Sequence, residues 1–119
     1  MTVQNRADCA KAFRIGKNLD RDMSYGRTPR LNTMIDALDC VTQKTASPRL
    51  ASLCVRAIVK HGPPHLVLQA HDHGLMGEDE WEAWKGRMRP ADAKIVLSSK
   101  EAWPQHIREW AAVVEISAR

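Results

Sequence analysis

Four polar residues on an otherwise apolar helix are the first group whose types and spacing could serve a function. They are separated by three, four and four positions, so a helix places them on one side: Arg49, Ser52, Arg56 and Lys60. A row of cations on a helix can follow the phosphates of a nucleic acid. The alternative is that Asp36 and Asp39, on the preceding predicted helix, neutralise this row.

Two further arginines, Arg27 and Arg30, lie next to Tyr25 at a predicted loop. A basic loop with one aromatic residue can stack a base while its cations contact phosphate. The distribution of charge along the chain also favours an anionic partner for the N-terminal half. Residues 1–60 carry 11 lysines and arginines against 5 acids, a balance of +6, whereas residues 61–119 carry 7 against 9, a balance of −2. The basic N-terminal half is therefore predicted to face a polyanion.

Histidines form a second cluster: His61, His65, His71 and His73. The last two follow a predicted strand, and alternate residues of a strand share a face, so His71 and His73 could hold a metal that activates water. A polar turn at the end of the strand is an alternative interpretation of residues 71–74. The sequence contains neither of the stronger metal-binding motifs, HExxH and paired CxxC. We therefore expect no metal and no cofactor, and keep a small metal-dependent hydrolase as an alternative.

The second half also holds all four tryptophans of a chain that has six aromatic residues. Their helical spacing favours core packing. An exposed subset would instead form a contact site for a protein partner, because Trp is enriched in such sites. The candidates for this partner site are Trp81, Trp84 and Trp103.

The elements that must position these residues are mainly helical. Apolar periodicity predicts a helix over residues 5–19, with Phe13 on its buried stripe, and a loop over 20–27. The near-identical letters "TPRL" (28–31) and "SPRL" (47–50) each combine a hydroxyl cap, a proline suited to the first helical position and a leucine that begins the core. They predict the starts of two more helices, the second of them strongly apolar and ending at a glycine.

Past residue 62 the pattern changes. The short apolar runs 65–70 and 93–99, bounded by Pro, Gly and Ser, predict strands on either side of a helix over 78–89. Buried helical segments remain the alternative for both runs. A helix is expected over 104–119, where 112–117 could instead form a strand. The predicted fold is α+β and mainly helical, with a three-helix N-terminal half, a short β-α-β-like segment and a C-terminal helix.

The 119 residues and the 44% hydrophobic fraction fit a single domain over 1–119, divided into a basic helical half (1–62) and a mildly acidic, Trp-bearing half (63–119). No apolar run is long enough to span a bilayer, and the N-terminus is too polar for a secretory signal. Cys9, Cys40 and Cys54 lack metal-binding spacing and are predicted to be buried, reduced thiols. We expect a cytoplasmic protein with no membrane contact.

The sequence offers no Ser-His-Asp set, P-loop or dinucleotide-binding loop, so no catalytic residue is assigned and a binding protein is favoured over an enzyme. The hypothesis is a non-enzymatic protein with an accessory or regulatory role. It would dock through its basic helical face on nucleic acid or a nucleoprotein assembly, and its Trp-bearing half would support homo-oligomers or a protein partner. A stoichiometric inhibitor or adaptor of a larger protein machine is the other alternative.

Overall fold

The computed structural model describes residues 3–101 and 103–118, with side chains from residue 10 onward. Within these residues the chain forms seven helices and no strand, and is 75% helical. The predicted α+β fold with a β-α-β-like segment is therefore wrong. Contacts divide the chain into two compact units, Met1–Gly62 (unit 1) and Pro63–Arg119 (unit 2). Each unit is described by itself, and the prediction of a single domain stays a prediction.

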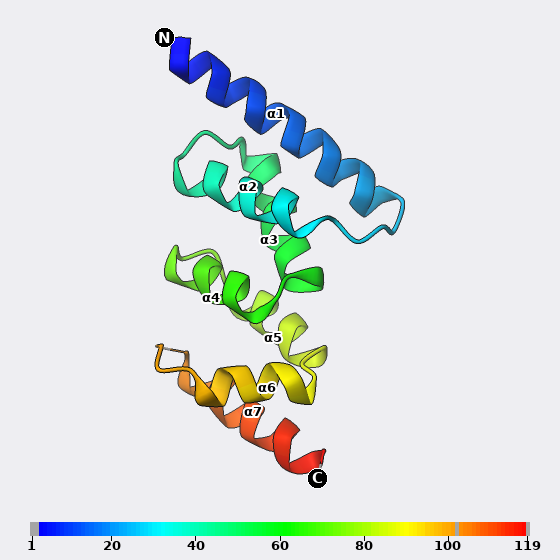
Figure 1. The fold of residues 1–119 in the computed structure, drawn as a ribbon, viewed down its shortest axis with the longest axis vertical. Coiled ribbons are helices and arrows are strands. Elements are labelled where there is room, and N and C mark those ends of the chain that lie inside the picture. The colour runs from blue at the N-terminus through cyan, green and yellow to red at the C-terminus, as the bar shows by residue number, and fades with distance from the viewer. Residues whose placement is uncertain (1–2, 102, 119) are drawn as a thin grey trace. The chain divides into compact units, whose positions relative to one another are not determined.

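Unit 1 consists of three helices that all pack on one another: α1 (Val3–Ser24), α2 (Leu31–Thr42) and α3 (Pro48–His61). The chain reverses after α1, and α2 runs back beside it (Figure 1). The predicted apolar face of α3 is confirmed, because six side chains of this helix are buried: Leu50, Leu53, Cys54, Ala57, Ile58 and Val59. In α1 the buried stripe is Ala12, Ile15 and Leu19.

The two similar tetrapeptides behave differently. Ser47 is the N-cap of α3, where its Oγ accepts a hydrogen bond from the backbone N–H of Leu50 at 3.1 Å, and Pro48 takes the first helical position. The prediction for Thr28 is wrong, since α2 begins three residues later with Arg30 as its N-cap and no side-chain cap bond. Pro29 is buried and precedes α2, so its ring packs in the interior and does not begin the helix.

This difference can be tested with a matched pair of substitutions. Ser47→Ala should lower the free energy of unfolding by about 1 kcal/mol, because the α3 N-terminus loses its side-chain acceptor. Thr28→Ala should change it by less than about 0.5 kcal/mol, as expected for an exposed residue that caps nothing. Urea unfolding measures both values. Equal costs at the two positions would contradict the assignment of the caps.

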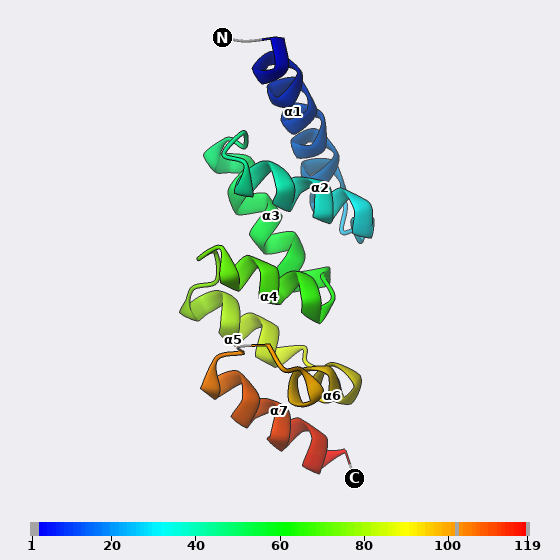
Figure 2. The ribbon, with the colours of Figure 1, turned by 60° about the vertical axis from the view of Figure 1, so that its left-hand side comes forward.

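Unit 2 contains four helices: α4 (Pro64–Asp72), α5 (Glu78–Gly86), α6 (Pro90–Ser98) and α7 (Gln105–Ser117). The closest packing is between α6 and α7, while α4 contacts α6 and α5 contacts α7 (Figure 2). The rings of Trp84 and Trp103 stack at a centroid distance of 5.5 Å and an interplanar angle of 8°. Trp81 meets both rings edge-on, at 6.0 and 6.4 Å. Three indoles thus form the centre of this unit.

Both predicted strands are helices for an identifiable reason. Pro64 and Pro90 stand in the first turn of α4 and α6, where their missing N–H has no intrahelical partner to lose. The prolines that seemed to bound strands therefore begin helices. The apolar run of α4 is buried on most sides, which removes the periodicity that distinguishes a helix from a strand. The segment 112–117 continues α7 and is not a strand.

Three helices, α1, α2 and α4, are followed two positions after their last residue by a residue with a left-handed backbone: Gly26 (φ 68°), Lys44 (φ 60°) and Gly74 (φ 73°). After α1, the N–H of Arg27 reaches the carbonyl of Asp22 at 2.8 Å, and that of Gly26 reaches Met23 at 3.3 Å. These two bonds satisfy carbonyls of the last turn, and α2 and α4 end with the same pair of bonds. This termination extends α1 to Ser24, into the predicted loop 20–27.

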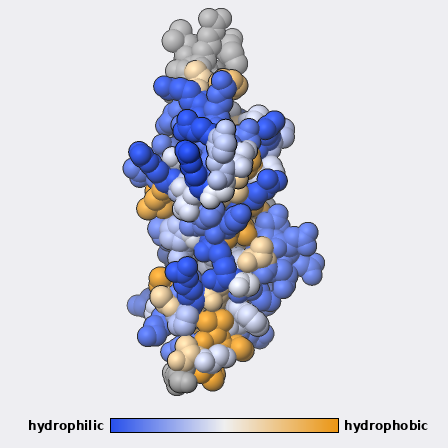
Figure 3. All heavy atoms as spheres, turned by 90° about the vertical axis from the view of Figure 1, so that its right-hand side faces the viewer, coloured by the Kyte–Doolittle hydropathy of each residue, from blue (hydrophilic) through white to orange (hydrophobic). Residues whose placement is uncertain are grey.

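The surface drawn in Figure 3 is mainly hydrophilic, with apolar side chains in several small groups, the largest of them in its lower part. The large exposed apolar residues of α6 and α7 are Ile95, Trp110, Val113 and Ile116. No helix in the described residues combines the length and the apolar composition needed to cross a bilayer.

Candidate functional site

The row Arg49, Ser52, Arg56 and Lys60, here called the basic stripe, lies on α3, and all four of its residues are exposed. The buried side of the same helix faces α1 and α2, so the stripe occupies the side left to solvent. Among the described residues, neither Arg56 nor Lys60 has an ion-pair partner. The predicted neutralisation by Asp36 and Asp39 is not seen, and two of the three cations remain available to an external anion.

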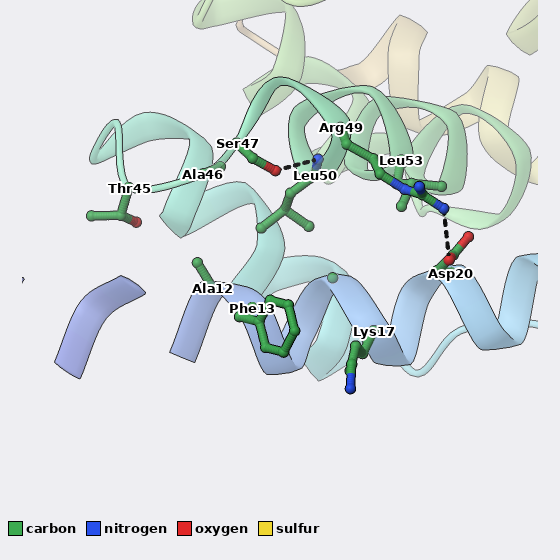
Figure 4. Close-up of a pocket in the computed structure, with 11 residues that line it drawn as sticks. Ala12, Phe13, Lys17, Asp20, Thr45, Ala46, Ser47, Arg49, Leu50 and Leu53 are labelled. Carbon is green, nitrogen blue, oxygen red and sulfur yellow. Dashed lines mark hydrogen bonds and ion pairs between the residues drawn. The ribbon is translucent and has the colours of Figure 1, made fainter. Parts of the chain in front are cut away.

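Arg49 is the exception, and its partner comes from α1. Its Nη2 lies 2.9 Å from Oδ2 of Asp20, with the Arg49 side chain 76% exposed (Figure 4). An ion pair so open to solvent contributes little to stability, between about 0 and 1 kcal/mol. Its main effect is to hold the guanidinium across the edge of α1.

A pocket of about 600 Å³ opens beside this ion pair. Its walls come from α1, from the turn between α2 and α3, and from the start of α3 (Figure 4). Ala12, Leu50 and Leu53 supply apolar surface, and Lys17 and Arg49 supply positive charge. We call it the α1–α3 pocket. It joins the basic stripe at Arg49.

Phe13 lines this pocket and is 65% exposed, so its predicted place on the buried stripe of the first helix is wrong. The stripe is centred on Ala12, Ile15 and Leu19, which turns Phe13 outward. The Nζ of Lys17 lies 5.0 Å from the centroid of the Phe13 ring. Sequence reasoning missed this residue, although a Phe and a Lys four positions apart on a helix are a recognisable signal.

Arg27 and Arg30 lie in the loop that joins α1 to α2, and both are exposed. The guanidinium carbon of Arg27 lies 5.5 Å from the centroid of the Tyr25 ring, which is itself 73% exposed. Arg30 is the N-cap residue of α2. This loop therefore gives unit 1 a second exposed aromatic ring with a cation above it.

The histidines are not brought together as a metal site. His71 and His73 lie at the end of α4, where residues two positions apart point to nearly opposite sides, so the strand argument for a shared face is wrong. His71 packs against Trp81 with ring centroids 5.4 Å apart, and His73 is exposed. Within the described residues, no three His, Cys, Asp or Glu side chains are placed to hold a metal ion.

The tryptophans proposed as partner contacts are interior residues. Trp81, Trp84 and Trp103 are all buried and pack on one another, so little of their surface is open to another protein. Trp110 is the exposed indole, and its Nε1 donates to the carbonyl of Lys85 at 3.0 Å. Burial gives Trp81, Trp84 and Trp103 a packing role in unit 2, and their role as partner contacts stays a prediction.

Trp84 allows a test of the packing role, because its Nε1 is buried without a hydrogen-bond partner among the described atoms. Trp84→Ala should cost about 3–5 kcal/mol of unfolding free energy through the cavity it leaves. Trp84→Phe should cost less, since it keeps a ring and removes an unsatisfied donor. Thermal unfolding compares the two variants. A Phe variant as unstable as the Ala variant would contradict the packing described here.

Cys40 and Cys54 are buried free thiols, as predicted, while the side chain of Cys9 lies outside the described residues. Burial raises the pKa of the Cys54 thiol from 9.0 to about 12, with a smaller contribution from Cys40. The native state therefore holds this proton more tightly than the unfolded state. The resulting stabilisation is complete below pH 9 and declines as the pH rises towards 12.

The same burial predicts slow thiol chemistry. In a Cys9→Ser variant at about pH 8, iodoacetamide should leave Cys40 and Cys54 largely unmodified in the native protein and alkylate both in urea, because the thiolate is the reactive species. Mass spectrometry of timed samples measures the rates. Rapid modification of Cys54 without denaturant would contradict its placement.

Comparison of the chain with protein-family models, with curated proteins and with solved structures gave no match.

Proposed function

We propose that this protein binds nucleic acid, alone or within a nucleoprotein assembly, through the basic face of unit 1, in a non-enzymatic accessory role. The observation that carries the proposal is the open basic stripe of α3. Arg56 and Lys60 are exposed and have no acidic partner among the described residues. Cations held on a rigid helix and not already neutralised can release counterions from a phosphate backbone on binding.

The surroundings of the stripe add to this support. Lys11, Arg14 and Lys17 on α1 are also exposed, in a half of the chain whose balance is +6. A surface of one dominant sign raises the local concentration of a polyanion and its association rate. The adaptor alternative relied on charge and on Trp anchors, and the three Trp residues proposed for it are buried. The hydrolase alternative relied on a strand that is a helix.

The test is a series of binding measurements by fluorescence anisotropy at salt concentrations from about 50 mM upward, with a labelled single strand and a labelled duplex. Arg56→Gln/Lys60→Gln should weaken binding and reduce the slope of log K against log salt concentration by roughly 1.4 for a single strand or 1.8 for a duplex, since two phosphate contacts are lost. Both positions are exposed, so the variant should fold.

Lys94→Gln/Lys100→Gln is the matched control, because it removes the same charge from exposed positions of unit 2. Its slope should equal that of the wild type. Failure of the wild type to bind either probe would overturn the proposal. An equal loss in both double variants would show that net charge, and not the stripe, determines binding.

A further inference from the structure

The α1–α3 pocket is large enough for a ligand of its own. Its volume of about 600 Å³ lies within the range of roughly 300–1,000 Å³ typical of small-molecule sites. Its walls are mainly apolar, with cations at the edge, so it suits a ligand that has a flat apolar part and a negative part. A base with its adjoining phosphate has this composition.

Phe13 provides the surface for the flat part. A phenylalanine that is 65% exposed on the wall of a pocket offers a ring face to a ligand. Stacking on such a ring is available to every base and requires no particular sequence. The Nζ of Lys17 lies over one face of this ring, 5.0 Å from its centroid, so a base would stack on the other face.

Arg49 provides the contact for the negative part. Asp20 uses one nitrogen of the guanidinium, at 2.9 Å, and a guanidinium has five N–H donors. The remaining donors are open to solvent on a side chain that is 76% exposed. Asp20 therefore orients Arg49, while its own negative charge opposes an incoming phosphate.

Ser47 adds a polar group on the wall opposite α1. Its Oγ accepts the capping bond from Leu50, which leaves the hydroxyl hydrogen available to a base carbonyl or ring nitrogen. One wall thus offers a ring and the other a hydrogen-bond donor, and Arg49 adds positive charge at the edge beside Asp20 (Figure 4).

We infer that the α1–α3 pocket seats one unstacked base of a single-stranded nucleic acid against Phe13, with the adjoining phosphate on Arg49. The inference rests on the proposed function and makes it specific. Bases in a duplex are stacked on their neighbours and cannot enter such a pocket, so single strands should bind more tightly than duplexes. The strand continues along Arg56 and Lys60, which contact its phosphates.

Substitutions at Phe13 test the stacking contact without disturbing the core. Phe13→Leu should weaken binding of an oligothymidylate or oligouridylate of about 12 nucleotides by roughly 5- to 150-fold, because it keeps an apolar side chain but removes the ring face. Phe13→Trp should bind as tightly as the wild type or more tightly. Ile116→Ala, at an equally exposed apolar position of unit 2, is the control and should have no effect.

Asp20→Asn tests the phosphate contact in the opposite direction. It keeps the shape of the side chain and removes the opposing charge, so affinity for the same probes should rise. Duplex binding should be insensitive to Phe13→Leu, and the thymidylate and uridylate probes distinguish DNA from RNA as the preferred strand.

The outcomes separate this inference from the proposal on which it rests. If the wild type binds neither single strands nor duplexes, the proposed function and the inference about the pocket are both overturned. If binding depends on the basic stripe but Phe13→Leu equals the wild type, only the pocket assignment is overturned. If Phe13→Leu weakens duplex and single-strand binding equally, the ring makes no contact with an unstacked base, and the inference is again overturned.

Discussion

Unit 1 depends on the burial of one strongly apolar helix, α3, against its two neighbours. Burying side chains such as Leu50, Leu53 and Ile58 contributes about 1.5–3 kcal/mol each, which no surface ion pair here approaches. That burial also determines where the polar residues of α3 can lie. With most of the circumference packed, Arg49, Ser52 and Arg56 share the remaining side. The basic stripe is therefore a geometric consequence of how the core is made.

The helices of unit 1 could be predicted because each has a periodic apolar face, and the face of α3 was predicted correctly. In unit 2 the helices predicted over 78–89 and 104–119 are present as α5 and α7. The helices α4 and α6 were predicted as strands, since their apolar runs are short and have no clear exposed face opposite a buried one. Proline was informative in both units. Pro48 was correctly placed at a helix start, whereas Pro64 and Pro90 follow the same rule and were interpreted as strand boundaries.

The candidate site was predictable to the extent that it lies on one helix. Spacing along α3 was sufficient to group Arg49, Arg56 and Lys60, and the structure places all three on the surface. The pocket requires α1, α3 and the turn before α3 to meet, which depends on tertiary packing. Neighbouring residues of a helix point about 100° apart, so a buried stripe that was predicted to hold both Ala12 and Phe13 was too wide.

The turn between α2 and α3 contains one residue, Lys44, in an energetically unfavourable backbone conformation. Lys44 has a φ of 60°, a conformation that costs a side-chain-bearing residue of order 1–3 kcal/mol and that glycine adopts freely, as Gly26 and Gly74 do after α1 and α4. The next residues, Thr45, Ala46 and Ser47, line the pocket. Glycine at this position would relax the backbone and remove a cation next to the pocket wall. Glycine at position 44 would favour stability, whereas the lysine that is present adds positive charge beside the pocket at a cost in backbone energy.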